Sequence, residues 1–144
     1  MGVGWCTFMA HKLLYRSAHV RDVDGVFRLI NKMGQAGRML RRSKYKIVTM
    51  LTNFIVAEAQ DGQLAGCGAL MPLWTDSAEV VSLAVDEPFQ RQGVGKALVR
   101  ELLQQARRLG FAQVLTLTYE VQFFSSLGFR VEPKENFPRK LWRE

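Results

Sequence analysis

The sequence has few of the residues that stabilise small secreted domains or bind structural metals. It contains two cysteines and two histidines among 144 residues. Cys6 and Cys67 are too few for a disulfide scaffold or a four-ligand zinc site, and His11 and His19 lack the spacing of metal ligands. We therefore expect a protein without a metal that folds in a reducing compartment, the cytoplasm.

Long apolar runs and linker-like segments are also absent. No stretch reaches the roughly 18 apolar residues of a transmembrane helix, which predicts no membrane partner. Residues 1–6 lack the basic start and the long apolar stretch of a signal peptide. No repeat, low-complexity tract or Pro/Ser-rich linker divides the chain. We expect one domain over residues 1–144, with residues 1–12 as a disordered or variable extension.

Acidic residues are scarce in the first third of the chain. Residues 1–50 hold ten basic side chains against only Asp22 and Asp24, whereas the remainder is close to neutral. The excess is greatest between Arg38 and Lys46, where no acidic residue interrupts the basic ones. Such a patch attracts anions, whether nucleic acid, phosphates or small carboxylates. A solvated helix face explains it equally well at this point.

The apolar pattern and the turn signals predict a mixed α/β sheet with helices on both faces. Strands are expected at residues 13–20, 53–59, 64–72, 78–85, 113–119 and 129–132, with a hairpin turn at Asp61-Gly62. Helices are expected from a cap at Asp22 or Asp24 to Met33, ended by Gly34 and Gly37, and over residues 96–109 and 121–127. A short additional helix can follow the basic patch.

The segment that joins the strand at 78–85 to the long helix, residues 86–96, predicts an anion site. Unpaired amides at a helix start converge on one spot, where the helix dipole adds positive potential. Gly93 and Gly95 permit a tight turn and close approach of a phosphate to the backbone. The spacing fits neither a P-loop nor the three-glycine dinucleotide motif.

This loop resembles that of a known family. Gln90-Arg91-Gln92-Gly93-Val94-Gly95 resembles the acetyl-CoA pyrophosphate loop of the GNAT superfamily of N-acetyltransferases, and the segment from Phe123 to Phe129 resembles its closing helix-Gly-Phe signature. The resemblance implies acetyl-CoA as co-substrate, direct attack by an amine, and splaying of the strands at 78–85 and 113–119. It assigns the cofactor to Leu83, Ala84, Val85, Gln90, Arg91, Gln92, Gly93, Val94, Gly95, Lys96 and Phe124.

The same resemblance suggests acid–base groups. Glu79 is similar to a strand glutamate that acts as general base in the superfamily, although a strand-edge carboxylate paired with a surface cation explains it too. Phe124 stands where many members have a tyrosine, and phenylalanine cannot donate a proton. Tyr119 is the replacement we expect as the acid, near Thr116 and Thr118; packing, or lining of the substrate site, explains Tyr119 equally well.

A closer resemblance points to the acceptor. Segments spread over residues 13–142 resemble, in order and spacing, the acetyltransferase domain of N-acetylglutamate synthases in its short stand-alone bacterial form: GRMLRRS from Gly37, NFIVAE from Asn53, GCGAL from Gly66, and Phe137-Pro138 near Lys140 and Trp142. This implies that L-glutamate is the acceptor and that the product enters arginine biosynthesis. Arg42 with Ser43, Thr118, Arg139 and Lys140 would then bind the substrate, because arginine binds carboxylates bidentately.

Two other functions remain compatible with the sequence. The acceptor can be another amine, such as a protein lysine or N-terminus, or the chain can be a non-catalytic module that binds acetyl-CoA or nucleic acid through its basic first third. A dicarboxylate acceptor explains Arg42 more directly and disfavours nucleic acid as the partner. The sequence does not determine the oligomeric state, and a homodimer is compatible with it.

Overall fold

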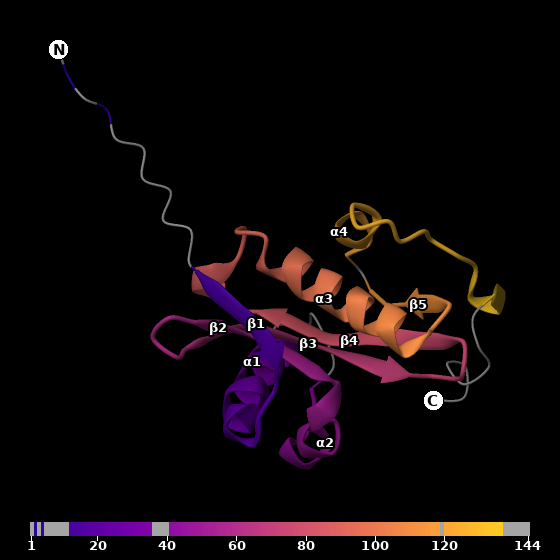
Figure 1. The fold of residues 1–144 in the computed structure, drawn as a ribbon, viewed down its shortest axis with the longest axis horizontal. Helices are drawn as coiled ribbons and strands as arrows, with labels where there is room; N and C mark the ends of the chain where they lie inside the picture. Colours follow the sequence, from indigo (N-terminus) through magenta and orange to yellow (C-terminus); the bar gives the residue numbers. More distant parts are fainter. Residues whose placement is uncertain (1, 3, 5–11, 36–40, 119, 137–144) are drawn as a thin grey trace.

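A single mixed sheet forms the centre of the protein. The computed structural model describes residues 2, 4, 12–35, 41–118 and 120–136, and in these residues five strands pair in the order β1-β2-β3-β4-β5 (Figure 1). Strands β1 to β4 are antiparallel neighbours, whereas β5 is parallel to β4. The predicted mixed sheet is therefore confirmed. The strands are β1 (Leu13–Ser17), β2 (Phe54–Ala59), β3 (Leu64–Pro72), β4 (Ser77–Val85) and β5 (Gln113–Leu115).

Helices cover both faces of this sheet, as predicted (Figure 1). α1 (Val23–Gln35) and α2 (Lys44–Thr49) lie on one face, and α3 (Val94–Leu109) and α4 (Val121–Ser125) on the other. Leu98, Leu102 and Ala106 recur at helical spacing and bury the inner side of α3 against the sheet. Val26 and Ile30 do the same for α1. Each face thus has its own apolar core.

The β2–β3 hairpin follows the predicted turn. Gly62 has a φ of 89°, which glycine adopts without steric cost, and the backbone nitrogen of Gln63 donates to the Asp61 carboxylate at 2.9 Å. Two boundaries near the start of the chain differ from prediction. β1 ends at Ser17 because Val20–Asp22 form a 3-10 turn, and α1 continues through Gly34 to Gln35.

The strand predicted at residues 129–132 is wrong, since none forms there. Gly128 turns the chain with a φ of 97°, and Phe129 then packs its ring against Phe124 at a centroid distance of 5.2 Å. Val131 is 77% exposed, so the apolar pattern of this segment does not reflect burial in a sheet. Packing on α4 has replaced strand pairing.

The predicted strand at 113–119 is also shorter than expected. β5 ends at Leu115, and the Thr116 hydroxyl donates to the backbone carbonyl of Val80 at 3.1 Å. The Thr116 hydroxyl therefore occupies a carbonyl group of β4 that would accept from a backbone amide if β5 continued to pair with β4. The α4 helix likewise stops at Ser125 rather than at residue 127.

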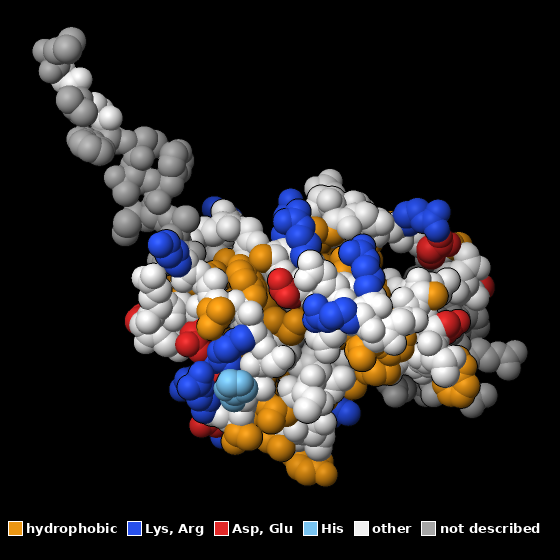
Figure 2. All heavy atoms as spheres, in the orientation of Figure 1, with side chains coloured by type: hydrophobic (Ala, Val, Ile, Leu, Met, Phe, Trp, Pro, Cys, Tyr) orange, Lys and Arg blue, Asp and Glu red, His pale blue; other side chains and the backbone are white. Residues whose placement is uncertain are grey.

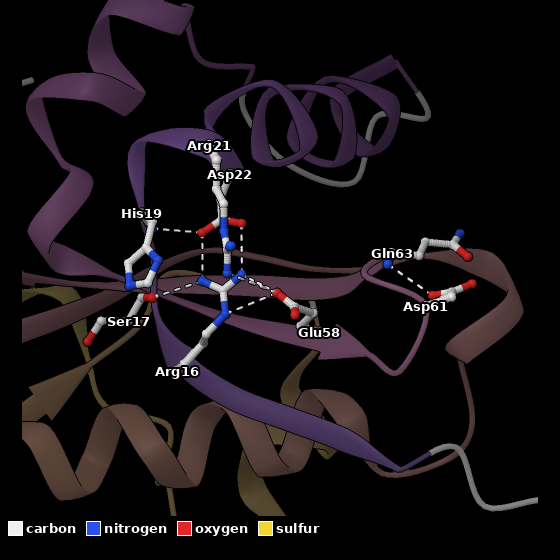
Figure 3. A network of polar contacts seen from close by, with 8 residues as sticks. All are labelled: Arg16, Ser17, His19, Arg21, Asp22, Glu58, Asp61 and Gln63. Carbon is white, nitrogen blue, oxygen red and sulfur yellow. Dashed lines mark hydrogen bonds and ion pairs between the residues drawn. The ribbon is translucent and has the colours of Figure 1, made fainter.

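An ion-pair network ties β1 to β2 and to the start of α1 (Figure 3). Arg16 donates to both carboxylate oxygens of Asp22, at 2.7 and 2.9 Å, and also binds Glu58. Asp22 additionally accepts from the backbone nitrogen of His19 at 2.7 Å. Burial acts to raise the pKa of Asp22, but the hydrogen bonds from Arg16 and His19 outweigh it and the pKa lies below its ordinary value. The ionised carboxylate therefore stabilises this corner of the fold.

We predict that Asp22→Asn lowers the free energy of unfolding by about 3 kcal/mol at pH 7, because a largely buried arginine loses one of its two anions. Because the pKa of Asp22 is lower in the folded state, its contribution is present above the unfolded value of about 3.9 and disappears as the pH falls through the folded value. Urea denaturation at several pH values should therefore show the two proteins converging in acid. A difference that is the same at every pH would exclude the Asp22 charge as its source.

Candidate active site

The parting of β4 and β5 defines the centre of the site. The two strands pair only at Ser77, Ala78 and Glu79, opposite Gln113, Val114 and Leu115. β4 then continues through residues 80–85 with no strand beside it on that edge, as far as the described residues extend. The predicted splaying is thus present, and Leu83, Ala84 and Val85 lie on the open stretch. Their backbone groups are available to an extended ligand there.

A β-bulge interrupts the open stretch of β4. The pairing register with β3 shifts between Cys67 and Ala69, and Ser82 has a φ of 56° at this point. Next to the bulge Gly66 of β3 pairs with Val85, and an added Cβ at Gly66 would come within 2.8 Å of the Ala84 carbonyl oxygen. The close approach of β3 to β4 therefore requires a glycine at position 66.

Cys67 is a small buried strand residue, as predicted. It is 0% exposed, and its thiol lies 3.5 Å from the carbonyl oxygen of Ser82, to which it donates. Burial raises the pKa of the Cys67 thiol to about 12, against a smaller lowering by the backbone of Ala84. The thiol stays protonated at neutral pH, which makes it a poor nucleophile and a lasting hydrogen-bond donor.

The loop between β4 and α3 forms the expected anion-binding geometry. Arg91 and Gly93 have φ values of 63° and 81°, and α3 begins at Val94 without a side-chain cap from Gly93. Successive backbone amides in such left-handed turns point inward toward one spot. Arg91, Gln92, Gly93 and Lys96 are exposed, whereas Val94 is buried and anchors the helix. The first turn of α3 contains no acidic residue that would repel an anion.

The side chains of this loop also brace it. Gln90 Nε2 donates to the Val85 carbonyl at 2.9 Å, and Gln92 Nε2 donates to the Pro88 carbonyl at 3.1 Å. A Cβ at Gly95 would lie 3.3 Å from the ring of Phe123, so its small size lets α4 pack beside α3. Gln90 therefore acts on the backbone of β4, a role that the sequence pattern did not indicate.

Arg42 reaches β4 from the segment before α2. Its Nε donates to the Ser82 hydroxyl at 2.6 Å, and its backbone carbonyl accepts from Asn31 Nδ2 at 3.1 Å. Among the described residues, no hydrogen bond or ion pair occupies its two Nη groups. The guanidinium is therefore anchored at one nitrogen while the other two remain able to bind an anion.

Glu79 lies on the same face of β4 as Arg42. Side chains alternate along a strand, so Glu79 shares its face with Val81, which packs against the core beneath α1 and α2. It is half-buried and pairs in register with Leu115 at the last position before the strands part. Glu79 therefore lies on the side of the sheet from which Arg42 reaches Ser82, at the point where β4 loses β5 as a neighbour.

The remaining predicted residues have structural contacts or lie outside the described chain. Ser43 caps α2 by accepting from the backbone nitrogen of Lys46 at 3.0 Å, and Thr118 accepts from that of Glu120 at 2.8 Å. Phe124 is buried, with its ring edge-to-face with Phe123 and Phe129. Tyr119, Arg139 and Lys140 are outside the described residues.

The basic patch is only partly free to bind anions. Lys44 pairs with Asp24 at 2.8 Å and lies 5.5 Å from the ring centroid of Phe27, so it is committed to α1. On the face drawn in Figure 2, Lys and Arg side chains are spread among hydrophobic and neutral ones rather than gathered in one band. Arg41 and Lys46 are exposed, whereas Arg42 is half-buried. Arg38 lies outside the described residues.

Within residues 12–35, 41–118 and 120–136, no helix is both long and apolar enough to cross a bilayer. Nor do three or more histidine, cysteine, aspartate or glutamate side chains gather there in a way that could hold a metal ion.

Sequence comparison assigns the family. The sequence model of the acetyltransferase (GNAT) family matches residues 34–129. An uncharacterized N-acetyltransferase of Chlorobaculum tepidum is 34% identical over 129 residues, which is 90% of this chain and 83% of that protein. The chain therefore belongs to the GNAT family: it is an acetyltransferase, and acetyl-CoA is its co-substrate.

Several relatives carry a more specific name. An amino-acid acetyltransferase of Mycobacterium tuberculosis is 38% identical over 117 residues, covering 79% of this chain and 66% of that one. The amino-acid acetyltransferase of Shewanella oneidensis is 30% identical over 127 residues, 87% of this chain but 28% of that one. The chain thus spans about two thirds of one of these enzymes and under a third of the other.

Solved structures agree with this grouping. Rv2747 of Mycobacterium tuberculosis, in complex with CoA and NLQ, superposes with a TM-score of 0.83 at 32% identity, covering 90% of this chain and 78% of that one. The N-acetylglutamate synthase of Neisseria gonorrhoeae, complexed with coenzyme A and N-acetyl-glutamate, gives a TM-score of 0.85 at 28% identity, over 92% of this chain and 32% of that one. The fold described above is shared with enzymes that bind coenzyme A.

Proposed function

We propose that this chain transfers the acetyl group of acetyl-CoA to the α-amino group of L-glutamate, the first step of arginine biosynthesis, in the cytoplasm. The observation that carries the proposal is the guanidinium of Arg42, which is anchored through Nε to Ser82 on the open part of β4 and has no Nη partner among the described residues. Arginine binds a carboxylate in a planar, two-point geometry, and every amino-acid acceptor brings a carboxylate. The amino-acid acetyltransferase relatives support the same acceptor class.

Acetyl-CoA has a separate place in this proposal. Its pyrophosphate binds the amides between Arg91 and Lys96 at the start of α3, where the helix dipole favours negative charge. Its pantetheine arm runs along the open edge of β4 at Leu83, Ala84 and Val85. A backbone amide of this stretch then polarises the thioester carbonyl and stabilises the negative charge that develops on it.

The acetyl transfer itself is a direct attack. Glu79 accepts the proton that the ammonium group of glutamate must lose before it can attack the thioester. Phe124 cannot return a proton to the departing thiolate, so we assign that role to Tyr119. Arg42 and Ser43 bind one carboxylate, and Thr118, Arg139 and Lys140 are the candidates for the second.

A peptide amine is the main competing acceptor. A lysine side chain or a protein N-terminus would bring no carboxylate close to its reacting nitrogen, and a neighbouring lysine or arginine in the peptide would be repelled by Arg42. CoA release with each free amino acid and with lysine-bearing peptides separates the two acceptor classes. Turnover on peptides without turnover on glutamate would refute the proposal.

We predict that Arg42→Ala raises the KM for glutamate about 10- to 100-fold, the loss expected when a hydrogen-bonded charged partner is removed. The KM for acetyl-CoA should stay within twofold, since the loop before α3 is untouched. Arg41→Ala is the matched control, because Arg41 is the exposed neighbour of Arg42. Equal effects of the two variants would show that only net charge matters.

We also predict that Glu79→Gln lowers kcat about 100-fold near pH 7, in the range of general-base catalysis. The deficit should shrink at higher pH, because more of the glutamate then carries a free amine that needs no base. A pH–rate profile from pH 6 to pH 10 measures this directly. A deficit that is independent of pH would assign proton removal to a bound water instead.

A further inference from the structure

Ser82 is a polar residue in an otherwise apolar strand segment, and it is held in an unfavourable conformation. It is 7% exposed, and its φ of 56° lies in the region that glycine adopts freely but other residues avoid. Among the described residues, Arg91 is the other non-glycine with a positive φ. A serine at this position is explained if its hydroxyl has a task that glycine could not perform.

The hydroxyl of Ser82 determines which edge of Arg42 is available. A guanidinium can bind a carboxylate through Nε and one Nη, or through its two Nη groups. Because Nε of Arg42 donates to Ser82 Oγ at 2.6 Å, the first edge is occupied. The Nη pair is the edge that remains for a two-point contact with an acceptor carboxylate.

The bulge fixes the hydroxyl in this position. The Cys67 thiol donates to the carbonyl oxygen of Ser82, so the peptide group that follows Ser82 is attached to β3. The register shift in the ladder occurs at the same point and sets the direction in which the Ser82 side chain leaves the strand. Ser82 thus joins β3, β4 and the segment before α2.

The backbone of Arg42 is held by α1. Asn31 of α1 donates through Nδ2 to the Phe27 carbonyl at 2.8 Å and to the Arg42 carbonyl at 3.1 Å. Main chain and side chain of Arg42 are therefore attached to two different elements, α1 and β4. An arginine anchored twice loses less rotamer freedom when it binds a ligand than a free one does.

We propose that Ser82 is a positioning residue for the acceptor. Its hydroxyl holds Nε of Arg42 so that the two Nη groups face the carboxylate of the incoming amino acid. This inference rests on the proposed amino-acid acceptor, and it adds how the enzyme orients that acceptor. Ser82 acts through Arg42 and leaves acetyl-CoA binding at the α3 loop unaffected.

The experiment is a double-mutant cycle with steady-state kinetics. Ser82→Ala and Ser82→Gly both remove the hydroxyl, and the glycine variant also removes the backbone strain. Both should raise the KM for glutamate about 5- to 20-fold, with kcat and the KM for acetyl-CoA within twofold. In an Arg42→Lys background, Ser82→Ala should change the KM for glutamate less than twofold, because lysine has no Nε to hold.

Ser77→Ala is the matched control. Ser77 lies on the same strand and is 1% exposed, and its hydroxyl has no hydrogen-bond partner among the described residues. Removing this hydroxyl should leave every kinetic constant within twofold. Thermal unfolding of each variant separates a local effect from a general loss of stability.

A spectroscopic readout tests the contact without substrate. The Nε–Hε signal of Arg42 in a ¹⁵N–¹H spectrum should be protected from exchange in the wild type and exchange faster in Ser82→Ala. An unchanged KM in Ser82→Ala, an equal effect in the Arg42→Lys background, or an unprotected signal in the wild type would each overturn the inference. The wild type could instead acetylate another amino acid, in which case the glutamate proposal fails. An effect of Ser82→Ala on the KM for that acceptor that depends on Arg42 would still support the positioning role of Ser82.

Discussion

The one-sided pairing of β4 is the constraint on which the rest of the structure depends. Among the described residues, β4 pairs with β5 only at its first residues and with β3 along most of its length, so residues 80–85 have no strand on their other edge. This part of β4 is therefore supported by β3 alone. Two contacts contribute: the close approach of the strands at Gly66, and the hydrogen bond from the buried Cys67 thiol to the Ser82 carbonyl. Three features assigned to the two substrates lie on or beside this edge: the loop before α3 at its end, the bulge in its middle and Glu79 where it opens.

In the proposed function, the two substrates are held from opposite faces of the sheet. The loop and α3 belong to the face that carries the larger core, where α4 packs through Phe123 and Phe124. Arg42 comes from the other face, attached to α1 through Asn31 and to β4 through Ser82. A nucleophile positioned from one face can therefore meet a thioester that is bound along the edge from the other. Direct transfer without a covalent intermediate needs this juxtaposition, because both reactants must be present together.

Much of the fold follows from local sequence signals, whereas the contacts across the sheet do not. The Asp61-Gly62 hairpin, α3 and the loop at Gly93 each depend on neighbouring residues and were predicted. The strand expected at residues 129–132 was wrong because ring packing between Phe124 and Phe129 replaced pairing, and alternation of apolar residues cannot distinguish the two. Arg42 was singled out from its motif, but its partner Ser82 was missed. That contact joins residues forty positions apart and exists only because of a bulge whose position depends on how β3 pairs with β4.

A crystal structure with CoA and L-glutamate bound tests the central claim most directly. The account predicts that a glutamate carboxylate lies within about 3.2 Å of both Nη atoms of Arg42, with Nε still on Ser82. It also predicts that the pyrophosphate accepts hydrogen bonds from backbone amides between Arg91 and Lys96. An acceptor carboxylate bound elsewhere, with the Nη groups of Arg42 facing solvent, would contradict it.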